Sequence, residues 1–90
     1  MKTLNTYHLE LTDTFGGEAN YSWKREYMVR AKTMRGAIQV LARKYGAGWS
    51  KAYGDNFDNA RYDLSGACIC CFVTYADPGE SIYADVPFIN

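Results

Sequence analysis

Two stretches near the beginning of the chain alternate between hydrophobic and polar residues. Residues 3–13 and residues 21–32 both show this period of two, which is typical of a β-strand with one buried and one exposed face. Between them, residues 15–20 contain two glycines and an asparagine, which favour a turn. The pattern therefore predicts a β-hairpin. The residues expected on its buried face are Tyr7, Leu9, Leu11, Trp23, Tyr27 and Val29.

The hydrophobic spacing changes after the hairpin. Between residues 34 and 45 the hydrophobic residues recur at intervals of three and four, which predicts an α-helix with one buried stripe. Thr33 is a suitable N-cap, because its hydroxyl can accept a backbone N–H of the first turn, and Gly46 suits the end of the helix. We expect Gly36, inside the helix, to allow a close approach to the sheet. The buried stripe would be Met34, Ala37, Ile38, Leu41, Ala42 and Tyr45.

The second half of the chain is less regular. Residues 46–60 mix turn formers with aromatic residues and are expected to form a long loop, with room for a short strand near 49–53. Residues 61–64 are expected to form a short strand. The apolar run 67–75, rich in β-branched and aromatic residues, predicts a central strand. Residues 77–90 are interpreted as a further edge strand or a docking arm.

These elements follow one another in the order β-β-α-β-β. We therefore predict a single α+β domain spanning residues 1–90, with one helix packed on an antiparallel sheet of about four strands. No run approaches the roughly 20 apolar residues that a membrane-spanning helix needs. Residues 1–20 lack the apolar segment of a signal peptide. We accordingly expect a cytosolic protein without a membrane partner.

Candidate chemistry is sparse. The three cysteines, Cys68, Cys70 and Cys71, are clustered and odd in number, which is not a disulfide framework. Their spacing does not suit a shared metal ion, and we interpret them as core residues of a buried strand. His8 is the only histidine and is expected to be exposed. We therefore predict a protein that is not an enzyme and has no metal or cofactor.

Charge is divided between the two halves of a chain whose net charge is zero. Eight basic and four acidic residues give residues 1–45 a charge of +4, and two basic and six acidic residues give residues 46–90 a charge of −4. Such a protein can present oppositely charged surfaces to its partners. Within the basic half, the polar face of the second predicted strand carries Lys24, Arg30 and Lys32, which are the candidate residues for binding nucleic acid.

Aromatic residues are concentrated where acidic residues also occur. This combination suits an Arg- or Lys-rich site on a partner protein, because aromatic residues are enriched at the centres of interfaces. The candidate protein-binding residues are Trp49, Tyr53, Asp55, Phe57, Asp58 and Tyr62. Self-association through the two charged halves is a third hypothesis, so that either a monomer or a homodimer is compatible with the sequence.

Three segments carry a resemblance to a group of known proteins. Residues 13–23 (DTFGGEANYSW), the pattern RGAI…YGAGW in residues 35–49, and residues 61–70 (RYDLSGACIC) resemble short uncharacterised accessory proteins of tailed phages and prophages. The resemblance implies a protein that binds and inhibits a host protein in the host cytosol. It also implies that a subunit of CRISPR or of another defence system is a suitable target, as in anti-CRISPR inhibitors. It supplies no catalytic residue.

Overall fold

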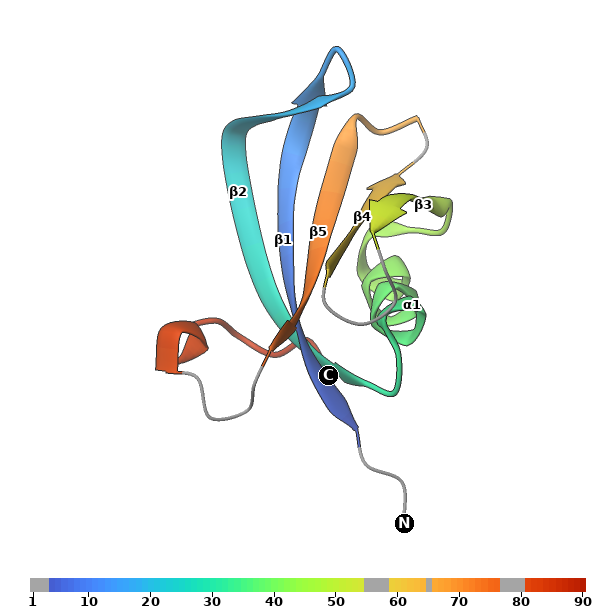
Figure 1. The fold of residues 1–90 in the computed structure, drawn as a ribbon. Coiled ribbons are helices and arrows are strands. Elements are labelled where there is room, and N and C mark those ends of the chain that lie inside the picture. Colours follow the sequence, from blue (N-terminus) through green and yellow to red (C-terminus); the bar gives the residue numbers. More distant parts are fainter. Residues whose placement is uncertain (1–3, 55–58, 65, 77–80) are drawn as a thin grey trace.

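The computed structural model describes residues 4–54, 59–64, 66–76 and 81–90. Its strands are β1 (Asn5–Phe15), β2 (Glu18–Ala31), β3 (Trp49–Gly54), β4 (Asn59–Leu64) and β5 (Ile69–Ala76), and its helices are α1 (Met34–Tyr45) and the short 3-10 helix η1 (Ser81–Tyr83). The strands form one sheet in the order β2-β1-β5-β4-β3, and all neighbouring strands are antiparallel (Figure 1). The predicted α+β fold with one α-helix and an antiparallel sheet is confirmed. The sheet has five strands rather than about four, because residues 49–54 add β3 at one edge.

The N-terminal hairpin forms as its alternation predicts. In the register of β1 and β2, Tyr7 lies opposite Val29 and Leu9 opposite Tyr27, so the hydrophobic residues of both strands share the inner face. The register shifts between Thr12 and Thr14, and Tyr21 adopts a positive φ of 56°. The long hairpin therefore bends near its tip and does not continue straight (Figure 1).

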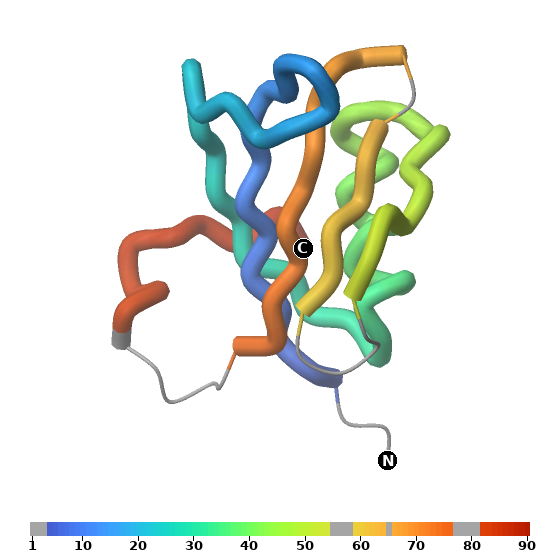
Figure 2. Tube along the Cα trace, turned by 45° about the horizontal axis from the view of Figure 1, so that its top comes forward, coloured from blue at the N-terminus to red at the C-terminus, as the bar shows by residue number. Residues whose placement is uncertain are grey.

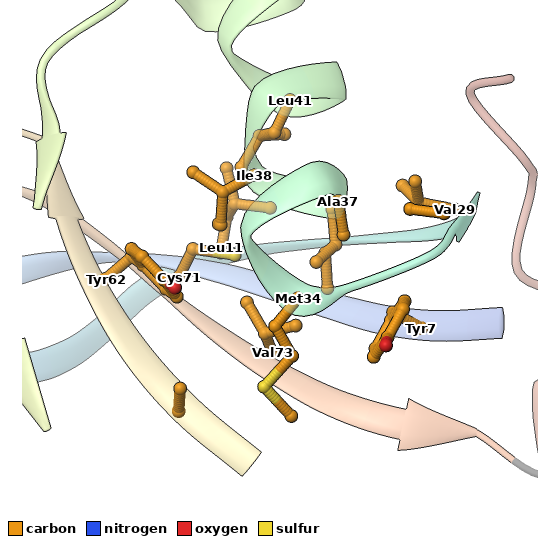
Figure 3. Close-up of a cluster of buried hydrophobic side chains, with 13 residues drawn as sticks. Tyr7, Leu11, Val29, Met34, Ala37, Ile38, Leu41, Tyr62, Cys71 and Val73 are labelled. Atoms are coloured by element: carbon orange, nitrogen blue, oxygen red, sulfur yellow. The ribbon is translucent and has the colours of Figure 1, made fainter. Parts of the chain in front are cut away.

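Helix α1 packs on the inner face of the sheet, and its ends are those that the sequence predicts. The Thr33 hydroxyl accepts a hydrogen bond of 3.0 Å from the Gly36 N–H, and the Gly46 N–H donates to the Ala42 carbonyl at 2.7 Å. Four residues of the expected stripe are buried, and they meet hydrophobic residues of β1, β2, β4 and β5 (Figure 3). The centre of the core consists of Leu9, Leu11, Val29, Met34, Ala37, Ile38, Leu41, Cys71 and Val73.

Two glycines lie where the backbone comes close to another element. A Cβ at Gly36 would be 3.4 Å from the Cβ of Ala31 and from Thr33 Oγ1, an ordinary van der Waals distance, so the position of the helix does not require the glycine that was expected to allow its close approach. At Gly54, with a φ of 112°, a Cβ would overlap the Cα of Ala60 on the paired strand. The close pairing of β3 with β4 therefore depends on glycine at this position.

The outer face of the sheet, opposite α1, is partly covered by the tip of the hairpin. Arg61 on β4 donates from Nη2 to the Gly17 carbonyl at 2.7 Å and from Nε to Asp63 Oδ1 at 2.9 Å. Near the bend, the Tyr21 N–H donates to the Thr12 hydroxyl at 2.9 Å. The bond from Arg61 to Gly17 holds the turn against the outer face, where the tube in Figure 2 shows it close to β5.

The C-terminal segment docks on the free edge of β2. The Met28 N–H donates to the Pro87 carbonyl at 2.8 Å, and the Ile89 N–H donates to the Met28 carbonyl at 3.1 Å, which makes a short parallel bridge. The Asn90 side chain accepts from the Arg30 N–H at 2.9 Å and donates to the Arg30 carbonyl at 2.7 Å. Of the two interpretations of residues 77–90, the docking arm fits this described part better than a full strand. Within the described residues, no helix is long and apolar enough to span a bilayer.

Candidate binding groove beside the helix

A groove of about 520 Å³ runs between α1 and the edge formed by β3 and β4. β3 is an edge strand of the sheet. Its first residues face the helix across this groove. The residues that line it are Arg35, Ile38, Gln39, Ala42, Ala47, Gly48, Trp49, Lys51 and Tyr62. A volume of this size is typical of sites that hold a small ligand or several side chains of a partner.

Trp49 forms part of the groove lining and also packs against the core. Its indole Nε1 is buried without a hydrogen-bond partner among the described residues. A buried donor that lacks an acceptor costs about 1–3 kcal/mol. Because the Nε1 atom is buried, the part of Trp49 that a bound molecule can contact is its ring.

Tyr62 forms part of the wall and belongs to the core. It is 9% exposed, and burial raises its pKa, while the nearby Arg35 guanidinium opposes the rise. In the register of β3 and β4, Lys51 lies opposite Tyr62, so the basic side chain of β3 lies on the same side of the sheet as this ring. The groove thus combines an aromatic wall with basic residues on both of its sides.

The basic character of the rim arises from the composition of α1. Residues 34–45 contain no acidic residue, whereas Arg35 and Gln39 are exposed on the side facing β3. In the described part of the chain, no carboxylate lies within 4.0 Å of Arg35. The charge of Arg35 therefore attracts carboxylates of a partner.

The structure brings together only some of the predicted protein-binding residues. Trp49 and Tyr62 both line the groove, whereas Tyr53 is 55% exposed and is not part of its lining. A register shift between Lys51 and Tyr53 places Tyr53 opposite Arg61, whose side chain lies on the outer face. The remaining predicted residues, Asp55, Phe57 and Asp58, lie outside the described residues.

The groove also contains residues that the sequence reasoning did not assign to a site. Arg35 and Gln39 lie outside the buried stripe that the helical period predicts, and Lys51 lies on an edge strand with no hydrophobic pattern. The signal that was available is the absence of acidic residues from the whole helix. It would have indicated a basic flank on α1 next to the aromatic residues.

The candidate nucleic-acid-binding residues lie in a region of mixed charge. Lys24 and Arg30 are on the outer face of β2, but the Lys24 Nζ is 4.0 Å from Glu10 Oε2. The Arg30 guanidinium is 3.9 Å from the ring centroid of Phe88 in the C-terminal segment. Lys32 is exposed just beyond the end of β2. The three basic residues therefore do not form a continuous cationic surface.

Two predictions about single residues are wrong. His8 was expected to be exposed, but it is buried, because its Nε2 lies 3.1 Å from Glu26 Oε1 and its ring stacks on Tyr83 at 4.6 Å. Cys68 was expected in the core, but it lies exposed in the turn before β5, with a φ of 54°.

The other two cysteines are buried as predicted. Burial raises the pKa of both Cys70 and Cys71, so both thiols stay protonated. Cys70 and His8 share the outer face but are four positions apart along the strands, or about 13 Å. Among the described residues, no group of three or more His, Cys, Asp or Glu side chains is placed to hold a metal ion.

Neither the family models nor the curated proteins nor the solved structures include a match to this chain.

Proposed function

We propose that this protein is a non-enzymatic binding protein and that the groove between α1 and β3 holds an acidic segment of a partner protein. The observation that carries the proposal is the position of Arg35 beside an aromatic wall: it lines the groove with Trp49 and Tyr62, and no carboxylate of the described residues lies within 4.0 Å of it. A carboxylate of the partner would pair with this guanidinium. An apolar side chain of the partner would pack on the two rings.

The other groove residues suit the same partner. Ile38 and Ala42 offer apolar surface between the aromatic wall and the helix, which a hydrophobic side chain of the partner can cover. Arg35 can form a bidentate pair with a carboxylate. Trp, Tyr and Arg are the residue types that most often dominate the binding free energy at protein interfaces, and the groove contains one of each.

The partner charge that the described groove favours is opposite to the partner charge that the sequence predicts. An Arg- or Lys-rich partner was expected because of acidic residues that include Asp55 and Asp58, and these lie outside the described residues. The described rim carries Arg35 and Lys51 and favours an acidic segment instead. In keeping with the resemblance to phage accessory proteins, we propose a host protein as the partner, with a subunit of a defence system such as CRISPR as the target of inhibition.

Selection from a random peptide library on the immobilised protein tests the chemistry of the groove. We expect enrichment of peptides that combine acidic residues with a hydrophobic residue. Binding should fall at least about tenfold in Arg35→Gln, because the charge-assisted hydrogen bonds to the peptide are lost, and by a smaller factor in Trp49→Phe, because part of the aromatic wall is lost. Lys24→Gln, on the outer face, is the matched control and should bind as the unaltered protein does. Enrichment of basic peptides, or equal binding by Arg35→Gln, would refute the proposed site.

A photo-crosslinking residue in place of the exposed groove residue Gln39 tests the identity of the partner class. In a bacterial lysate, the crosslink should be to a protein, should survive nuclease treatment and should disappear in the presence of an enriched peptide. The same photo-crosslinking residue in place of Lys24 serves as the control. A crosslink that is lost on nuclease treatment would favour nucleic acid as the partner and contradict the proposal.

A further inference from the structure

A second cluster of basic and aromatic side chains lies between α1 and β2. The hydroxyl oxygens of Tyr27 on β2 and Tyr45 at the end of α1 are 3.2 Å apart. The Lys44 Nζ is 5.5 Å from the centroid of the Tyr27 ring. Arg25 lies two residues from Tyr27 on the same face of β2, and its interaction with Tyr27 is the main cause of the raised pKa of its guanidinium. Two cations and two hydroxyl groups thus converge on one place.

The pKa values of the two tyrosines shift in opposite directions. The pKa of Tyr27 is lowered, first of all by its hydrogen bond with Tyr45, whereas burial and the bond with Tyr27 raise the pKa of Tyr45. Either hydroxyl can donate in the bond between them, so one hydroxyl can donate to a ligand while the other donates within the pair. The neighbouring cations Lys44 and Arg25 also lower the pKa of Tyr27.

The cations of the cluster are not neutralised by the described part of the chain. No carboxylate there lies within 4.0 Å of Arg25 or Lys44. The neighbouring acid, Glu26, points to the other face of β2, where it contacts His8. An anion bound beside Tyr27 would therefore meet positive charge from two sides and a hydroxyl donor, without displacing an internal ion pair.

The basic residues of this cluster do not continue into a row along the surface of α1. Arg35 and Lys44 are nine residues apart on α1, and at 3.6 residues per turn this places them about 180° apart around the helix axis. Arg35 therefore lies at the groove on one flank of α1, and Lys44 lies at the tyrosine pair on the other. A polymer backbone requires a continuous row of cations, whereas one tetrahedral anion requires only one such cluster.

We propose that Arg25, Lys44 and the Tyr27 hydroxyl form a binding site for a phosphate group of a small molecule. The guanidinium can bind two phosphate oxygens in parallel. The ammonium and the hydroxyl supply further donors from other directions. This site lies on the opposite flank of α1 from the groove, and the inference does not rest on the proposed function.

Titration of the isotope-labelled protein with inorganic phosphate, followed by NMR at constant ionic strength, tests the site. We expect saturable shifts at the Arg25 side chain and at the amides of Lys44 and Tyr45. Sodium chloride at equal ionic strength should not reproduce them. Arg25→Gln and Lys44→Gln should each weaken phosphate binding about tenfold or more, and Tyr27→Phe several-fold. Lys24→Gln, next to Arg25 but on the opposite face of the strand, should leave the affinity unchanged.

Two further ligands distinguish the source of the phosphate. Adenosine monophosphate should bind at the same residues with at least the affinity of inorganic phosphate. A ten-residue oligothymidylate should show no preference for these residues. Shifts that chloride reproduces, or an equal loss of affinity in Lys24→Gln, would overturn the proposal. So would oligothymidylate binding that is weakened to the same degree by every basic-residue variant, since that pattern indicates non-specific attraction of polyanions.

Discussion

Arg61 is predicted to be the residue whose charge contributes most to the stability of the outer face. Its side chain is buried, with the residue 9% exposed, and it donates to the Gly17 carbonyl at 2.7 Å and to Asp63 at 2.9 Å. Arg61→Met retains most of the aliphatic stem and removes both hydrogen bonds. The bond to the Gly17 carbonyl is of the charge-assisted kind, for which about 1.5–3 kcal/mol is typical.

The bond to Asp63 contributes less. The Asp63 side chain is 42% exposed, so it regains hydration when the guanidinium is removed, and about 1 kcal/mol or less is expected from this pair. Together the two bonds predict a loss of about 3 kcal/mol of unfolding free energy. In a domain of this size that corresponds to a fall in melting temperature of roughly 12–24 °C.

Urea denaturation followed by tryptophan fluorescence measures this change, and Arg43→Met on the exposed surface of α1 is the control. A second measurement, amide hydrogen exchange, reports where the structure loosens. Exchange should accelerate at the tip of the β1–β2 hairpin before it does so in the core. A change in unfolding free energy below about 0.5 kcal/mol, or an unaltered exchange rate at the tip, would refute the reasoning that Arg61 holds the turn.

Three other predictions concern particular contacts. Gly36→Ala should stabilise the protein by up to about 1 kcal/mol. Gly54→Ala should destabilise it by at least about 2 kcal/mol, because Gly54 has a positive φ and a Cβ there would overlap Ala60. Urea denaturation measures both changes. Hydrogen bonds from Ser22 and Asn20 lower the pKa of Asp13. Its contribution to stability is therefore present above its ordinary pKa of 3.8 and is lost as the pH falls further, so Asp13→Asn should show a flatter acid limb in unfolding measurements. Asn90→Ala should accelerate amide exchange at Arg30 about fivefold, since about 1 kcal/mol of local stability is lost.

Each of these predictions has an outcome that contradicts it. Equal effects of alanine at Gly36 and Gly54 would show that the local backbone does not decide the result. An acid limb of Asp13→Asn that is as steep as that of the unaltered protein would assign acid unfolding to other carboxylates. Unchanged exchange at Arg30 would show that the C-terminal segment is held by Phe88 and the backbone bonds and not by the Asn90 side chain.

The sequence predicts well those elements in which hydrophobic residues recur at a regular spacing. β1, β2 and α1 each bury one face, so their alternation or helical spacing reports the fold directly. β3 is different, because five of its six residues are exposed. An edge strand with so little burial leaves no hydrophobic pattern, and its pairing with β4 becomes visible only in three dimensions.

The candidate site was predictable only in part, for a related reason. Trp49 and Tyr62 stand out in the sequence as aromatic residues in an irregular region, but their contact with the helix depends on the register of β3. The direction of Tyr53 depends on the shift after Lys51, which no local pattern indicates. The basic flank of α1 was visible in the sequence and became significant only when the helix was placed beside Trp49.

The position of β5 has a consequence for the synthesis of the protein. This strand lies between β1 and β4, yet it is the last of the five strands to leave the ribosome. Until it is available, β1 has an unpaired edge, and the hydrophobic core of the hairpin and helix lacks Cys71 and Val73. The contacts that complete the sheet join segments about 60 residues apart, which is typical of slow folding. The nascent chain therefore passes through a stage with an open strand edge and exposed apolar surface, in which it depends on protection from aggregation.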